Sequence, residues 1–265
     1  MREAVVYLDY AATSALRPPV VAAAVAAFLR DNGATPGRGG HRLAIDAGRI
    51  ALRCRRELAS LLNIPGDPGR IAFQHNATHA LNTALHGLLR PGDVVVTTSV
   101  EHNAVARPLH VLQRTRSIQV RRIPCAADGA LDLDTAKRQL AGARLLAVTA
   151  ASNVLGTVTP LVPLARMAHE AGALLLVDAA QAAGIVPIDT TALGIDLLAL
   201  TGHKGLLGPQ GTGALWVRER LDVAPLLRGG TGGGRDPQPR VKWWLVGPRV
   251  RPHLSERKPA EHVHR

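Results

Sequence analysis

The chain has few cysteines, few aromatic residues and no long hydrophobic run. Its 265 residues include two cysteines, Cys54 and Cys125, and 3% aromatic residues. Two isolated cysteines exclude a disulfide framework and a CxxC metal site, so we expect a reducing, cytoplasmic location. Without a run of 18 apolar residues or a signal-peptide pattern after Met1, we expect no membrane partner. The 46% hydrophobic and 20% charged residues are typical of a globular chain with a sizeable core.

Acidic residues are also scarce relative to basic ones. Twenty acids against 32 basic residues give a net charge of +12, and such an excess can indicate a nucleic-acid or membrane-surface partner. However, only four of the 32 basic residues are lysines, which indicates a coding bias towards arginine. No basic patch interleaved with aromatic residues accompanies the charge. We therefore expect no nucleic-acid partner.

Short apolar runs alternate with helical patterns over about 200 residues. The expected strands are 71–73, 94–97, 118–123, 145–149, 174–177, 197–200 and 213–217. The expected helices are 18–30, 45–62, one ending at residue 89, 108–114, 134–140 and 161–171. This alternation predicts an α/β fold with a mostly parallel central sheet flanked by helices. Apolar runs without alternation indicate strands that are covered on both faces.

The amino-acid composition of the sequence changes after residue 228. Residues 229–234 are almost all glycine, and residues 236–265 contain five prolines and a net charge of +4. We therefore expect one domain over 1–235 and a basic, proline-rich tail over 236–265 that is disordered or an aberrant ending. Two adjacent indoles in the tail, Trp243 and Trp244, could dock onto exposed apolar surface.

Polar residues follow five of the expected strands. They occupy positions 75–79, 99–103, 152–153, 178–181 and 201–204. Because ligands of α/β proteins bind at the carboxyl ends of the strands, we expect these residues to form one site.

Two of these residues suggest a specific chemistry. Lys204 is one of only two lysines before the tail, and a lysine amine can form a Schiff base whereas arginine cannot. The alternative is an ordinary surface lysine. Asp178 ends a buried strand, where a carboxylate needs a partner such as a protonated pyridine nitrogen. The alternative is an Asp that caps the next helix.

The histidines and Thr78 allow two interpretations each. Thr78 and His79 begin a helix and could bind phosphate, or they could simply cap it. His102 could lie flat on an aromatic ring or cap the segment that follows. None of the eleven histidines forms an HxxxH or HExxH pair within an expected helix, so we expect no metal site.

Taken together, seven segments resemble the class V aminotransferase family of pyridoxal 5'-phosphate (PLP) enzymes, within the cysteine desulfurase and selenocysteine lyase branch. The segments are YLDYAAT at 7–13, PGRGGH at 36–41, NATHALN at 76–82, EHN at 101–103, SN at 152–153 with Gly156, VDAAQ at 177–181 and GHKGLLGPQGTG at 202–213. They occur in the family's order across residues 5 to about 235. The resemblance implies the large domain of the fold-type I PLP enzymes.

The resemblance also implies a role for each candidate residue. Lys204 would bind PLP as a Schiff base and, with His102, act in catalysis. Asp178 would pair with the pyridine nitrogen, and Gln181 with the ring hydroxyl. The other implied contacts are His102 stacked on the ring, Asn153 at the cofactor or substrate, and Thr78, His79, Thr201 and His203 around the phosphate. The implied reaction removes sulfur from L-cysteine and releases alanine, with cysteine or selenocysteine as substrate, a sulfur-acceptor protein and a homodimer as partners.

The sequence departs from the family in its C-terminal part. No cysteine follows Lys204, whereas the family's sulfur-accepting cysteine lies there, and neither Cys54 nor Cys125 matches it. The family's C-terminal small domain, with its arginine for the substrate carboxylate, does not appear. The alternatives are an inactive truncated fragment whose tail comes from a frameshift or truncation, another class V aminotransferase or lyase activity on a small amino acid, or a basic-tailed interaction protein.

Overall fold

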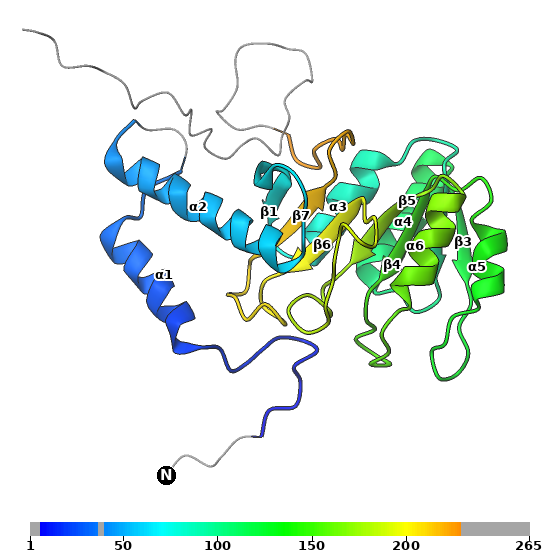
Figure 1. The fold of residues 1–265 in the computed structure, drawn as a ribbon, viewed down its shortest axis with the longest axis horizontal. Helices are drawn as coiled ribbons and strands as arrows, with labels where there is room; N and C mark the ends of the chain where they lie inside the picture. Colours follow the sequence, from blue (N-terminus) through cyan, green and yellow to red (C-terminus); the bar gives the residue numbers. More distant parts are fainter. Residues whose placement is uncertain (1–5, 37–39, 229–265) are drawn as a thin grey trace, which may run out of the picture.

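A seven-stranded sheet forms the centre of the molecule (Figure 1). The structure is a computed structural model and describes residues 6–36 and 40–228. The strands run in the order β1-β7-β6-β5-β4-β2-β3. Their bounds are β1 Ile71–Gln74, β2 Val94–Thr98, β3 Gln119–Ile123, β4 Leu145–Thr149, β5 Leu174–Asp178, β6 Leu197–Thr201 and β7 Gly213–Val217. All pairs from β6 to β3 are parallel, and β7 is antiparallel to both of its neighbours. The prediction of a mostly parallel sheet is confirmed.

The central strands are buried on both faces. Every residue of β4 and β6 is buried, as their unbroken apolar runs predict. Alternate residues of β4 enter opposite cores, with Leu146 and Val148 in one cluster and Leu145 and Ala147 in the other. Burying each leucine contributes about 1.5–3 kcal/mol, so a shift of strand register would be costly.

Helices cover both faces of this sheet. The helices are α1 Pro19–Asp31, α2 Arg42–Leu61, α3 Ala77–Leu88, α4 Asn103–Arg116, α5 Leu133–Gln139 and α6 Leu161–Glu170, with a short 3-10 turn, η1, at Pro68–Arg70. Residues of α3 and α4 belong to one core cluster, and residues of α5 and α6 belong to the other. The layers are therefore α/β/α. Helices α1 and α2 lie beyond the β1 end of the sheet (Figure 1), and α1 buries none of its residues.

The largest error of the sequence-based prediction concerns α4. The sequence predicts a helix over 108–114, which would place Pro108 at its first position. The helix begins at Asn103 instead, since the His102 side chain caps it and Pro108 lies inside it. Likewise, α2 begins at Arg42 rather than at residue 45, with His41 as its cap.

Two further expectations concern membrane-spanning helices and the C-terminal tail. Among the described residues, no helix is long and apolar enough to cross a membrane. The expected domain boundary at 235, the tail over 236–265 and its Trp243 and Trp244 lie outside the described residues.

Candidate active site

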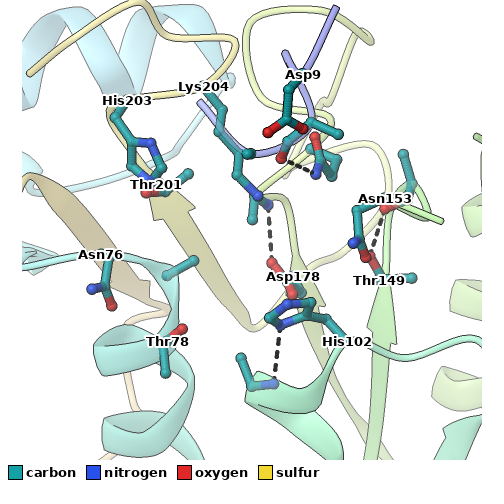
Figure 2. A pocket seen from close by; sticks show the side chains of 17 residues that line it. Asp9, Asn76, Thr78, His102, Thr149, Asn153, Asp178, Thr201, His203 and Lys204 are labelled. Carbon is teal, nitrogen blue, oxygen red and sulfur yellow. Dashed lines mark hydrogen bonds between the residues drawn. The ribbon is translucent and has the colours of Figure 1, made fainter. Parts of the chain in front are cut away.

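The strand ends meet at a cavity of about 430 Å³. The last residues of β4, β5 and β6, namely Thr149, Asp178 and Thr201, all line it. Eight of the nine residues predicted from the sequence lie on its wall: Thr78, His102, Asn153, Asp178, Gln181, Thr201, His203 and Lys204 (Figure 2). The parallel arrangement of these strands explains the convergence, because their carboxyl ends share one edge of the sheet.

Asp178 places a carboxyl group at the base of this cavity. The residue is 3% exposed, and its Oδ1 accepts a hydrogen bond from the Ala180 backbone N–H at 2.9 Å. Burial raises the pKa of Asp178, while the Ala180 N–H, His102 and Lys204 oppose this by favouring the charged form. The alternative interpretation, an Asp that caps the next helix, is wrong, because no helix follows β5 among the described residues and Ala180 belongs to a turn.

Lys204 extends into the cavity towards Asp178 and His102 (Figure 2). Burial lowers the pKa of its amine, and the Asp178 carboxylate acts in the opposite direction. A lowered pKa increases the share of neutral, nucleophilic amine, which is the form that attacks a carbonyl group. The backbone beneath Lys204 is held by Ser14, whose hydroxyl donates to the Lys204 carbonyl oxygen at 2.9 Å.

The His102 ring is fixed at the start of α4. Its Nδ1 accepts a hydrogen bond from the Ala104 backbone N–H at 3.0 Å, so a neutral imidazole carries its proton on Nε2. The capping interpretation of His102 is therefore confirmed. Stacking on a ring stays a prediction, and the position of His102 on the cavity wall is compatible with it.

One side of the cavity is suited to an anion. The amino end of α3 lies there, with Asn76 and Thr78 on the cavity wall, and the Asn76 side chain caps the helix by accepting from the His79 N–H at 2.8 Å. The Thr201 hydroxyl is buried without a hydrogen-bond partner among the described residues. A helix amino end, two hydroxyl groups and the His203 imidazole form a donor set that fits a phosphate group.

His79 is the one predicted residue that does not line this cavity. It lines a second, mostly apolar cavity of about 780 Å³ between α2 and the β1 edge, where its ring stacks on His75 at a centroid distance of 5.2 Å. Burial, and to a smaller extent His75, lowers the pKa of His79. Successive residues of a helix point about 100° apart, so Thr78 and His79 face different cavities.

The comparisons with known proteins agree with this geometry. The family model described as "Aminotransferase class-V" matches residues 6–235. The chain belongs to the class V aminotransferase family. This match confirms the resemblance seen in the sequence, and the solved structures below confirm the fold-type I architecture. Class V aminotransferases and cysteine desulfurases are PLP-dependent enzymes.

Members of this family with curated names include two close matches to the chain. A probable cysteine desulfurase of Pyrococcus abyssi is 37% identical over 237 residues, covering 87% of this chain and 58% of that protein. One from Methanothermobacter thermautotrophicus is 38% identical over 231 residues, covering 85% and 56%. The chain therefore spans somewhat more than half the length of these two proteins.

Solved structures match the chain in the same way. The apo structure of a cysteine desulfurase from Thermococcus onnurineus NA1 has a TM-score of 0.81 and 35% identity, covering 86% of this chain and 57% of that one. A structure described as SspA in complex with cysteine has a TM-score of 0.76 and 28% identity, covering 84% and 65%.

Three polar cavity residues had no role assigned from the sequence. Asp9 and Asn76 lie in segments that carried the resemblance, and Thr149 ends β4. Asp9 lies on the cavity wall because it belongs to a segment, residues 9–17, that we call the strap. The Gln181 Nε2 donates to the Ala11 carbonyl oxygen at 2.8 Å, which ties this strap to the cavity. A contact across 170 residues has no local sequence signal.

Neither cysteine lies at the cavity. Cys54 lines the second cavity, where burial raises the pKa of its thiol. Cys125 accepts a hydrogen bond from the Ser99 hydroxyl at 3.2 Å and lines neither cavity.

Proposed function

We propose that this chain binds PLP covalently through Lys204 and removes sulfur from L-cysteine, releasing alanine. The position of Lys204 supports this most directly, because its half-buried amine points into a cavity whose base carries the Asp178 carboxyl group. When bound, PLP supplies a pyridine ring that withdraws electrons from an attached amino acid.

The residues of the cavity base would orient the ring. Asp178 would hold a proton on the pyridine nitrogen by a charge-assisted hydrogen bond. The Gln181 amide nitrogen already donates to Ala11, so its carbonyl oxygen is left to accept from the ring hydroxyl. His102 would cover one face of the ring, and Asn153 would contact the cofactor or the substrate.

The anion-suited side of the cavity would bind the phosphate. Thr78, Thr201 and His203 line that wall, and His203 is oriented by a 3.0 Å hydrogen bond between its Nδ1 and the Thr13 hydroxyl. The role of His79 would be indirect, since its ring lines the second cavity.

The relatives support the proposed substrate. Cysteine as substrate is supported by the names of the relatives and by the SspA structure with cysteine. Selenocysteine, a sulfur-acceptor protein and a homodimer are further parts of the proposal. A cytoplasmic location is supported by the two unpaired cysteines.

One observation favours a second candidate, a chain that binds PLP without transferring sulfur. Sulfur transfer in this family needs a cysteine thiol, and neither Cys54 nor Cys125 lines the Lys204 cavity. The same observation is compatible with another class V activity on a small amino acid.

The test is reconstitution of the full 265-residue chain with PLP. We expect a visible absorption band, and after borohydride reduction a PLP-modified peptide that contains Lys204. Lys204→Arg, which keeps the charge but cannot form the bond, should lose both signals, whereas the matched exposed control Lys137→Arg should keep them. Failure of the wild-type chain to take up PLP would refute the proposal.

Adding L-cysteine then separates the two candidates. In an assay that contains a dithiol reductant, which reduces the released sulfane sulfur to sulfide, stoichiometric alanine and sulfide support the desulfurase. Bound PLP with no alanine formed supports the second candidate.

A further inference from the structure

Glu101 lies directly behind the cavity and does not line it. Its Oε1 joins the ends of two strands, accepting a hydrogen bond from the Thr98 hydroxyl of β2 at 2.6 Å and another from the Thr149 backbone N–H of β4 at 3.1 Å. Its Oε2 is buried and has no hydrogen-bond partner within the described part of the chain. The two oxygens of this carboxyl group are therefore in different environments.

No positive charge of the described residues pairs with Glu101 at short range. Among residues 6–36 and 40–228, no ion pair within 4.0 Å involves it. A carboxylate buried without a cation is far more unfavourable than a buried neutral acid with one unmatched hydroxyl. Burial, together with the charge of Asp178, raises the pKa of Glu101 to about 8 despite the hydrogen bonds from Thr98 and Thr149.

Asp178 of β5 is the acidic neighbour of Glu101, because Asp178 pairs in register with Thr149, whose N–H donates to Glu101. The surroundings of the two carboxyl groups differ. Burial raises the pKa of Asp178 as well, but the Ala180 N–H, His102 and the Lys204 amine stabilise its charged form. The groups that face Glu101 are the Thr98 hydroxyl and the Thr149 N–H. The titratable groups that face Asp178 are His102 and Lys204. When two close acids have such unequal environments, one proton is held by the less stabilised carboxylate.

We propose that Glu101 and Asp178 share a single proton at neutral pH, that Glu101 holds it, and that Glu101 thereby leaves Asp178 as the negative charge at the base of the cavity. Glu101 is then a positioning residue that acts through Asp178. A second anion here would favour the charged form of the Lys204 amine and so suppress its nucleophilic form. The value of this arrangement for PLP rests on the proposed function, whereas the location of the proton is a property of the chain alone.

The test is a carboxyl NMR titration of the full chain without PLP, labelled with ¹³C at the glutamate Cδ. We expect one glutamate resonance to remain in its protonated position at pH 7 and to titrate near pH 8. This resonance should be absent from Glu101→Gln and present in the matched control Glu170→Gln, which changes an exposed glutamate at the end of α6. The proposal is overturned if every glutamate titrates in the acidic range, or if the late resonance survives in Glu101→Gln.

A second variant tests the coupling and does not depend on the folding of Glu101→Gln. In Asp178→Asn the neighbouring anion is gone, so the late glutamate resonance should titrate at lower pH than in the wild-type chain. An unchanged midpoint would show that Asp178 does not carry the charge and would overturn the proposal. Because no PLP is present, these results stay readable if the chain never binds the cofactor.

Discussion

Replacing Glu101 by glutamine should make the stability of the folded chain less sensitive to a rise in pH between about 4.5 and 8. Burial and Asp178 raise the pKa of Glu101 from 4.5 in the unfolded chain to about 8 in the folded one. Between these two values the folded state binds the proton and the unfolded state has lost it, so the free energy of unfolding falls as pH rises. Below pH 4.5 both states are protonated and this loss is absent.

The expected size follows from this difference. One proton changes the free energy of unfolding by about 1.4 kcal/mol per pH unit, or roughly 3 kcal/mol between pH 5 and pH 7. Glutamine has no proton to lose and can still accept from Thr98 and Thr149 through its carbonyl oxygen. The stability of Glu101→Gln relative to wild type should therefore increase by about this amount across the window.

Chemical denaturation of both proteins at pH 5, 6, 7 and 8 measures this difference directly. Asp178 is present in both chains, so its own titration largely cancels. The exposed control Glu170→Gln should follow the wild-type curve at every pH. Parallel curves for wild type and Glu101→Gln would refute the reasoning, because they would mean that Glu101 is already ionised in the folded chain at pH 7.

Three other predictions concern the cofactor site, the sheet and the tail. Asp178→Asn should weaken PLP binding by roughly 1.5–3 kcal/mol, the worth of a charge-assisted hydrogen bond, and equilibrium dialysis showing unchanged affinity would contradict its role. Gly213→Ala should lower the thermal midpoint by several degrees, because a Cβ there would lie 2.7 Å from both the Asn76 Cα and the Leu200 carbonyl oxygen; an unchanged midpoint would show that β7 can shift. Deletion of residues 236–265 should leave the thermal midpoint nearly unchanged, and a large drop with solubility retained would show that this segment is an integral part of the fold.

The strands and the cavity could be predicted from the sequence because their signals are local. An unbroken apolar run such as Leu145–Thr149 indicates a strand that is buried on both faces. The polar residue after such a strand indicates the edge of the sheet at which ligands bind. Lys204 and Asp178 could be singled out for this reason, since each follows or ends such a run.

The features that were missed depend on contacts with distant residues or on side-chain direction. The start of α4 was misplaced because Pro108 is a more familiar marker than a histidine cap at His102. The different directions of Thr78 and His79 follow from the exact first residue of α3, which sequence patterns give only within a few residues. The buried environment of Glu101 includes the Thr149 backbone N–H, which lies 48 residues further along the chain.

The strap formed by residues 9–17 has a consequence for how the chain is made. Its contacts with the loop after β6 include hydrogen bonds from Thr13 and Ser14 to backbone oxygens 190 residues later, and β1 has its sheet neighbour, β7, at the far end of the described chain. During synthesis from the amino end, both early segments must wait until residues 203–217 have left the ribosome. Contacts of such long sequence separation slow folding, so we expect the parallel strands β2 to β6 to assemble first and the cavity around Lys204 to close last.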